Sequence, residues 1–201
     1  MNTKKHVLLT TAFMVAAFFF SACGDDGKTI TDARDGKKYK ITTIGNQVWM
    51  AENLNYEMNG SWCYNDEPNN CKVYGRLYSY QAAQKACPTG WHLPNATEWQ
   101  ILADYVGDGE NIDKLKTKLG WGFDDVEKKS LNGSDEFDFS VLPGGYRYNG
   151  EFVDEGRCAG FWEYTDKTMG EPFIFGILIV FDVDELHKKN ADSFSIRCIK
   201  D

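Results

Sequence analysis

The stretch Cys87-Pro88-Thr89-Gly90-Trp91-His92-Leu93-Pro94-Asn95-Ala96-Thr97-Glu98-Trp99 leads into the clearest helix of the chain. Asn95 is a favourable N-cap residue, and Glu98 follows three positions later, which is the pattern of a capping box. Apolar residues then recur at helical spacing at Trp99, Leu102, Tyr105 and Val106. The stretch therefore predicts a helix over Asn95–Val106 with one buried face.

Strand patterns lie on both sides of this helix. Before it we predict strands over Lys28–Thr31, Lys38–Ile44 and Gln47–Met50, with hairpin turns at Asp35-Gly36 and Gly45-Asn46. After it we predict strands over Phe137–Leu142, Phe161–Tyr164, Phe173–Phe181 and Ser193–Ile199. Phe173–Phe181 is apolar throughout and is expected to be a central strand buried on both faces. Two further helices are predicted over Tyr78–Ala86 and Asn111–Lys118, so the element order indicates an α+β fold.

The composition is that of one globular domain. The chain has 201 residues, 42% hydrophobic and 26% charged, which excludes wholesale disorder. No internal repeat or linker interrupts residues 28–201, so these form a single predicted domain. The formal net charge of −8 argues against a nucleic-acid partner. An acidic body suits neutral or basic partners better than anionic ones.

The N-terminal segment has the features of an export signal. Two lysines precede the apolar stretch Val7–Phe20, which would span about 21 Å as a helix and is too short for a bilayer. Phe20-Ser21-Ala22-Cys23 resembles the lipobox of bacterial lipoproteins. The resemblance implies a signal peptide over 1–22, cleavage before Cys23 and lipidation of Cys23, which would anchor the protein to a membrane. The alternative is an ordinary signal peptide, with Cys23 in a disulfide.

A short acidic tether follows the predicted lipid anchor over residues 23–27. Gly24-Asp25-Asp26-Gly27 resembles the surface-export signals of Bacteroidetes-type lipoproteins. The resemblance implies a lipid-anchored protein of the bacterial outer membrane, displayed on the cell surface, with the periplasmic face as the alternative. Removal of Lys4 and Lys5 with the signal takes the formal side-chain charge from −8 to −10.

Five stretches resemble the Fibrobacter succinogenes major paralogous domain and follow that family's order. They are Val48–Tyr56 (Val-Trp-Met-Ala-Glu-Asn-Leu-Asn-Tyr), Tyr74–Tyr78 (Tyr-Gly-Arg-Leu-Tyr), Cys87–Pro94 with Glu98-Trp99, Leu142–Arg147 (Leu-Pro-Gly-Gly-Tyr-Arg) and Ser195–Cys198 (Ser-Ile-Arg-Cys). Together they cover essentially residues 28–201. The resemblance implies no established activity.

Trp91-His92-Leu93-Pro94, followed by Glu98-Trp99, is also similar to the core of formylglycine-generating and related proteins. That resemblance implies a C-type-lectin-like fold, with two to three helices packed on small twisted, mainly antiparallel sheets and long irregular loops. It also implies a disulfide between Cys87 and Cys198, at the end of the first helix and in the last strand. Formylglycine-generating activity needs a paired-cysteine copper site near the C-terminus, and Cys198 alone stands there.

Three other cysteines have separate predicted roles. Cys63 and Cys71 bracket the polar, turn-favouring segment Tyr64–Asn70, and we predict that they form a disulfide. Cys158 is then the free thiol. It is expected to be a small buried residue before a strand, and the alternative is a reactive thiol whose pKa Arg157 lowers.

No complete catalytic or metal-binding constellation is visible, so no catalytic residue, metal or cofactor is predicted. Glu67-Pro68-Asn69 matches a calcium-binding tripeptide of C-type lectins but lies before both main helices. Asp108–Ile112 departs from the EF-hand pattern. Asp182, Asp184 and Glu185 could gather a hard cation, although a solvated strand end is the simpler interpretation. His92 is expected to be structural.

Aromatic residues provide the remaining functional signal. We predict Trp49, Trp91, Trp99 and Trp162 to be buried. Tyr146, Arg147, Tyr148 and Trp121 are the candidate ligand-binding residues, because flat rings beside polar groups can stack on sugars or anchor proteins.

The predicted function is a non-enzymatic binding or adhesion module, with a polysaccharide as the first candidate ligand. The sequence leaves two alternatives open. One is a protein-binding or structural lipoprotein of the envelope, and the other is an oxidoreductase of the formylglycine-generating type.

Overall fold

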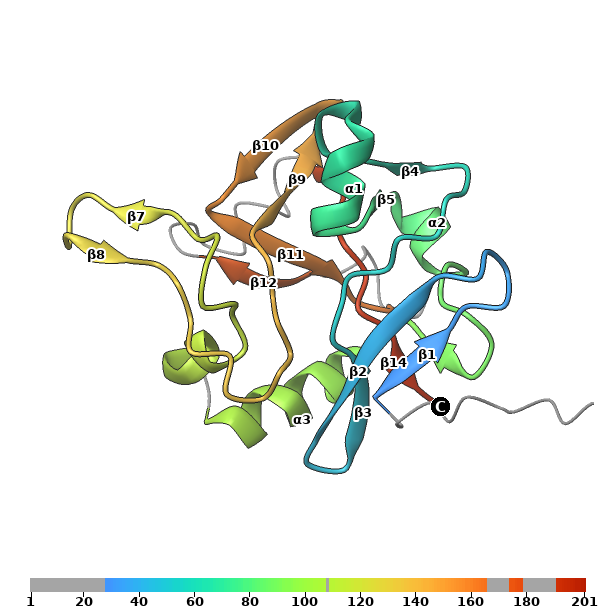
Figure 1. The fold of residues 1–201 in the computed structure, drawn as a ribbon, viewed down its shortest axis with the longest axis horizontal. Helices are drawn as coiled ribbons and strands as arrows, with labels where there is room; N and C mark the ends of the chain where they lie inside the picture. The colour runs from blue at the N-terminus through green and yellow to red at the C-terminus, as the bar shows by residue number, and fades with distance from the viewer. Residues whose placement is uncertain (1–27, 108, 166–173, 179–190) are drawn as a thin grey trace, which may run out of the picture.

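The N-terminal strands share a sheet with the C-terminal end of the chain (Figure 1). The computed structural model describes residues 28–107, 109–165, 174–178 and 191–201. This sheet has the order β1-β2-β3-β14-β6, and every pairing in it is antiparallel. The strands cover Thr29–Thr31, Lys38–Ile44, Gln47–Met50, Ile199–Lys200 and Trp91–His92. The predicted N-terminal strands and the turn at Gly45-Asn46 are confirmed.

A second sheet is formed by the later part of the chain and has the order β10-β9-β11-β12, with β13 also paired to β9. These strands cover Glu151–Glu155, Gly144–Tyr148, Cys158–Trp162, Ile174–Leu178 and Ala191–Ser193. The contact between β9 and β11 is parallel, and the other pairings are antiparallel. Within the predicted strand 173–181, β12 pairs with β11, and the burial of its side chains lies outside what the structure describes.

Two small hairpins complete the β-structure. β4 (Ser61–Trp62) pairs with β5 (Leu77–Tyr78), and β7 (Phe123–Asp124) pairs with β8 (Lys129–Ser130). The β7–β8 hairpin projects from the body of the molecule in Figure 1. Small antiparallel sheets with a few short helices place the described chain in the α+β class, as predicted.

Helix α3 (Ala96–Val106) confirms the capping-box prediction. The Asn95 side chain accepts a hydrogen bond from the Glu98 backbone N–H at 3.1 Å, and the Glu98 carboxylate accepts one from the Asn95 N–H at 2.9 Å. Gly107 ends the helix in the left-handed conformation. The helix buries Trp99, Leu102 and Val106, whereas Tyr105 is exposed.

The other two predicted helices are shorter and tighter than expected. In place of a helix over Tyr78–Ala86, α2 covers Tyr80–Ala83 only, and Tyr78 belongs to β5. In place of one over Asn111–Lys118, a 3₁₀ helix, η2, covers Gly109–Lys114. Both segments continue through i to i−3 hydrogen bonds, such as Ala86 N–H to Ala83 O and Leu115 N–H to Ile112 O.

A helix also forms where only turns were expected. Between Cys63 and Cys71 the chain makes a 3₁₀ turn, η1 (Tyr64–Asp66), and then helix α1 (Pro68–Tyr74). Pro68 begins this helix, where its fixed φ is favourable and its missing N–H costs nothing.

The strand predicted over Phe137–Leu142 is wrong. Asp138 and Ser140 have φ values of 50° and 54°, which an extended strand does not permit. The segment is irregular and makes a single bridge, Val141 with Lys116. The strand predicted over Ser193–Ile199 is also divided, into β13 and β14, with isolated bridges at Phe194 and Ser195.

Two apolar clusters hold the sheets and helices together. One surrounds Trp49 and Trp99, whose ring centroids lie 4.7 Å apart, and it includes Phe139 and Phe161. The other surrounds Tyr78 and contains residues from α2, the 194–198 segment and β11. In the described part of the chain, no helix combines the length and apolarity needed to cross a bilayer.

Candidate functional site

A fully buried arginine joins three distant segments of the chain. The Arg197 guanidinium donates to Asn53 Oδ1 at 2.6 Å, to Ser140 O at 2.9 Å and to Met50 O at 3.3 Å, and also to Phe139 O. The rings of Phe139 and Phe161 flank it, with centroids 4.9 and 5.7 Å from its Cζ. The segment after β3, the irregular 139–140 segment and the chain before β14 therefore meet at one cation.

This cation has no ion-pair partner among the described residues. Burial lowers the pKa of Arg197 to about 9, while the charges of Glu52 and Asp135 act in the opposite direction from a distance. The group is still charged at neutral pH, because a pKa of 9 lies well above it. Backbone and amide oxygens thus solvate a positive charge inside the protein.

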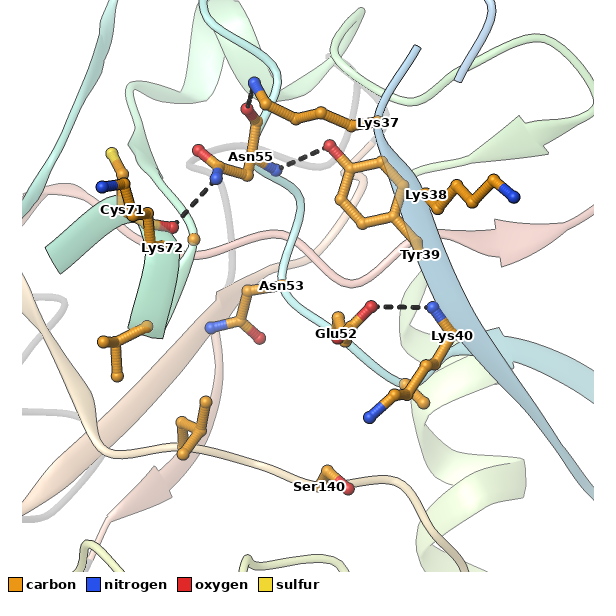
Figure 2. A pocket seen from close by; sticks show the side chains of 14 residues that line it. Lys37, Lys38, Tyr39, Lys40, Glu52, Asn53, Asn55, Cys71, Lys72 and Ser140 are labelled. Atoms are coloured by element: carbon orange, nitrogen blue, oxygen red, sulfur yellow. Dashed lines mark hydrogen bonds between the residues drawn. The ribbon is translucent and has the colours of Figure 1, made fainter. Parts of the chain in front are cut away.

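An open pocket of about 350 Å³ adjoins this junction and is shown in Figure 2. Its walls are β2, the segment 51–55, helix α1 with Gly75, and residues 140 and 142. Asn53 and Ser140, which both bond Arg197, also line the pocket. Figure 2 shows the Lys40 side chain reaching into the space above Ser140, whereas Lys38 points away from it.

Hydrogen bonds hold the walls of the pocket in place. Asn55 donates its side-chain N–H to Cys71 O at 2.9 Å and its backbone N–H to the Tyr39 hydroxyl at 3.1 Å. Glu52 accepts the backbone N–H of Lys40 at 2.7 Å. Burial raises the pKa of Tyr39 to about 12, so this hydroxyl is neutral and can accept the Asn55 N–H. The 52–55 segment therefore ties β2 to α1.

Gly75 permits the close approach of α1 to this segment. It caps the helix with φ at 72°, and a Cβ built there would lie 2.7 Å from the Asn53 Cβ and 2.9 Å from Leu54 O. Any larger residue would clash with backbone, so this wall of the pocket requires glycine.

A second cavity of about 530 Å³ adjoins the first along β2. The two share Lys40, Ala51 and Ser140, and the second adds residues 28–29, 41–43 and 138. We call the two cavities together the β2 trough. The shared residues place the two cavities next to each other along β2.

Comparison with known proteins identifies the family. The model of the Fibrobacter succinogenes major domain matches residues 42–200. The chain belongs to this family. No curated protein and no solved structure matches it, so the C-type-lectin-like architecture stays a prediction.

Four of the five stretches that resemble the Fibrobacter succinogenes major domain meet at the trough. Val48–Tyr56 supplies its central wall, Tyr74–Tyr78 supplies Gly75, and Leu142–Arg147 supplies Leu142. Ser195–Cys198 supplies Arg197 beneath the floor. The stretches that resemble the family therefore build the scaffold of this site.

The remaining stretch, Cys87–Pro94 with Glu98-Trp99, lies at a third cavity of about 350 Å³. Trp91 and His92 line this cavity together with Tyr164. His92 bonds Asp201 through Nδ1 at 2.7 Å and Glu98 through Nε2 at 2.8 Å. Burial alone would lower the pKa of His92, but the hydrogen bonds and charges of the two carboxylates outweigh it and raise the pKa. Since Glu98 also closes the capping box, His92 joins the start of α3 to the end of the chain.

The candidate ligand residues from the sequence do not form one surface. Tyr146 stacks on Phe194 at 5.4 Å, on the inner side of β9. The Arg147 guanidinium lies over the Trp62 ring at 4.5 Å and pairs with Asp192 at 3.8 Å. Neighbouring residues of a strand face opposite sides, so Arg147 is separated from Tyr146 and Tyr148. All three are half-buried.

Trp121 does not have the surface position expected of a ligand contact. Its side chain is 5% exposed within the first apolar cluster, and its Nε1 donates to Thr117 Oγ1 and Val141 O. The structure therefore places Trp121 in the core and not on an exposed surface. Of the tryptophans predicted to be buried, Trp49, Trp99 and Trp162 are confirmed, whereas Trp91 is half-buried.

The cysteine predictions are confirmed where the structure describes them. Cys63–Cys71 and Cys87–Cys198 are disulfides, and Cys158 is free and buried. Burial raises the pKa of the Cys158 thiol, with the Asp154 charge acting in the same direction. This opposes the alternative of an activated thiolate.

The candidate cation sites are only partly described. Glu67-Pro68-Asn69 spans the start of α1, and Asn69 Oδ1 accepts from Lys72. No group of three potential ligands gathers in the described ranges. Asp108 and the group Asp182, Asp184 and Glu185 lie outside them, as do the predicted signal peptide, Cys23 and the tether.

The sequence did not point to the lysines of the trough. Lys40 and Lys72 are both exposed. Lys40 belongs to a predicted strand, and Lys72 lies just after a predicted loop. The available signal was the alternation Lys38-Tyr39-Lys40, which places two cations on the outer face of β2. Nothing in the sequence indicated that α1 would bring Lys72 beside them.

Proposed function

We propose that this protein is a lipid-anchored, non-enzymatic binding module that is displayed on the outer surface of a bacterial cell and takes a polysaccharide ligand in the β2 trough. The lipid anchor at Cys23 and the surface location rest on the sequence of the N-terminal segment. The ligand site rests on the described fold.

The observation that carries the proposal is the pair of adjoining cavities along β2, with walls that are hydrogen-bonded to one another. Two adjoining cavities follow β2, and their walls are joined by the hydrogen bonds of residues 52–55 to β2 and α1. Two adjoining open cavities can accept neighbouring units of an extended chain. A preformed site also costs little ordering free energy when it binds.

Two other functions compete with this one. A protein-binding or structural role in the envelope would use surfaces such as the projecting β7–β8 hairpin, where Val126 is 91% exposed. An oxidoreductase of the formylglycine-generating type would need a reactive cysteine pair. Cys198 is bonded to Cys87, and the pKa of the buried Cys158 is raised, both of which favour the binding module.

The test is binding of the full chain to an array of neutral and acidic polysaccharides, followed by titration of each positive. A Thr43→Trp variant fills the second cavity without changing charge, because Thr43 is exposed and lines it. Tyr164→Ala, at the third cavity, is the matched control. We expect saturable binding that Thr43→Trp weakens and Tyr164→Ala leaves unchanged. Absence of binding to every polysaccharide would refute the proposal.

A further inference from the structure

The trough is basic although the chain is acidic. The whole chain has a formal net charge of −8. The two cavities are nevertheless lined by five lysines, against one glutamate and one aspartate. The local charge therefore has the opposite sign to that of the molecule.

The uncharged polar groups of the first cavity are already used by the protein. Asn53 donates to Tyr74 O at 2.8 Å and accepts from Arg197. Asn55 donates to Cys71 O, and the Ser140 hydroxyl donates to Asp135 at 2.8 Å. These donors can contact a ligand only by giving up bonds that hold the walls together.

Three of the five lysines have ammonium groups that remain for a ligand. Lys38, Lys40 and Lys72 make no ion pair with any residue that the structure describes, and the Lys72 ammonium bonds only the neutral Asn69 side chain, at 3.0 Å. Lys37 differs, because Asp35 pairs with it at 3.0 Å. Among the unpaired lysines, Lys40 on β2 and Lys72 on α1 line the first cavity from different walls, whereas Lys38 points away from it.

A further positive charge lies beneath the floor. Arg197 bonds Asn53 and Ser140 from below, and both residues line the cavity. Because the guanidinium is fully buried, water screens its field less than that of a surface charge. An anion in the first cavity would therefore meet cations on both walls and under the floor.

Glu52 and the acidic remainder of the chain oppose this attraction. The Glu52 carboxylate is half-buried in the wall and bonds the Lys40 backbone N–H. More distant carboxylates matter less, because the screening length at physiological ionic strength is about 8 Å. Charges inside the trough therefore determine its preference.

We propose that the ligand is an acidic polysaccharide whose carboxylate or sulfate groups pair with Lys40 and Lys72. This inference rests on the proposed function and specifies its ligand class. The cations stand on two walls, so acidic groups on successive sugar units can meet them in turn. Lys38 contributes at the edge of the trough.

The test compares ligands that differ only in charge. The full chain is titrated with polygalacturonate and with fully methyl-esterified polygalacturonate, and with dextran sulfate and dextran. The lysine variant is Lys40→Gln/Lys72→Gln. Its control, Lys118→Gln/Lys128→Gln, removes the same charge from exposed positions in or beside the β7–β8 hairpin. Thermal unfolding verifies that every variant is folded.

We expect the chain to bind one of the two acidic polymers, and much more weakly the neutral counterpart of that polymer. The acidic polymer that binds identifies carboxylate or sulfate as the group recognised. The lysine variant should lose about tenfold in affinity, and the control less than about twofold. Glu52→Gln should bind about threefold more tightly, because it removes the opposing charge and keeps an acceptor for Lys40.

Equal binding to the charged and neutral forms, or equal losses in the lysine variant and its control, would overturn the inference and leave the proposed function standing. Absence of binding to any polysaccharide would overturn both.

Discussion

Replacement of Arg197 tests whether a buried cation holds the trough together. In Arg197→Met the side chain keeps its approximate length and loses both the charge and its four hydrogen bonds. Three of the acceptors are backbone carbonyls, of which Met50 O and Phe139 O are bonded in buried positions and Ser140 O lies beside the open pocket. We therefore expect a large loss of stability.

The magnitude follows from those acceptors. A buried group left without a partner costs about 1–3 kcal/mol, and relaxation of the site recovers part of this. Burial of the guanidinium is itself unfavourable, so its removal returns some free energy. We expect a net loss of about 4 kcal/mol, which is a large fraction of the 5–15 kcal/mol typical of a domain. Arg197→Lys keeps the charge and some of the bonds, and it should lose about 2 kcal/mol.

The assay is urea unfolding with both disulfides intact, followed by tryptophan fluorescence. Arg157→Met, at an exposed arginine, is the control and should change the unfolding free energy by less than about 0.5 kcal/mol. Thermal midpoints should fall by about 8–16 °C for Arg197→Met. The unfolding free energy of Arg197→Met could instead lie within about 1 kcal/mol of that of the native chain. The free-energy cost of burying the cation would then equal the stabilisation that its hydrogen bonds provide. Arg197 would then not be what holds the trough together.

Three further predictions concern the rest of the described fold. Loss of the Cys87–Cys198 disulfide, with a sequence separation of 111, should destabilise the fold by roughly 5 kcal/mol. Loss of Cys63–Cys71, with a separation of 8, should cost roughly 2.5 kcal/mol. Equal losses in the two double-alanine variants would contradict the loop-length argument. The folded-state pKa of His92 is raised, so its contribution is complete below its unfolded pKa of about 6.5 and is lost as the pH rises through the folded value. The stability difference between native and His92→Gln chains should accordingly be larger at pH 5.5 than at pH 8.5, and parallel profiles would contradict this. Cys158 should resist a thiol reagent in the native protein at pH 8 and react in guanidinium, as measured by peptide mass mapping; rapid native labelling would show that its burial is transient.

Local signals predicted the parts of the fold that depend on local interactions. The helix at Asn95 was predictable because its cap is made by residues three apart, and the first hairpin because its turn lies between alternating strands. The residues from 137 to 142 alternate like a strand, but Asp138 and Ser140 adopt positive φ. The backbone and side chain of Ser140 bond Arg197 and Asp135, and the contact with Arg197 lies outside any local window.

The candidate site was less predictable than the fold for the same reason. Aromatic residues around Tyr146 stood out in the sequence because of their type, yet Tyr146 and Trp121 are used in packing. The trough lysines did not stand out, because isolated surface lysines are common. Lys72 lines the same cavity as residues of β2 only because α1 folds against residues 52–55.

The support of the trough and its charge come from different residues. The stretches shared with the Fibrobacter succinogenes major domain supply the buried side of the trough, including Asn53, Gly75 and Arg197. The exposed cations are supplied elsewhere. Residues 37–40 precede the matched range 42–200, and Lys72 lies between two of the shared stretches. A change at Lys40 or Lys72 alters the charge of the trough without disturbing its support, because neither ammonium holds the walls together. The proposed preference for acidic polysaccharides therefore depends on Lys40 and Lys72, whereas the support of the trough depends on other residues, including Asn53 and Arg197.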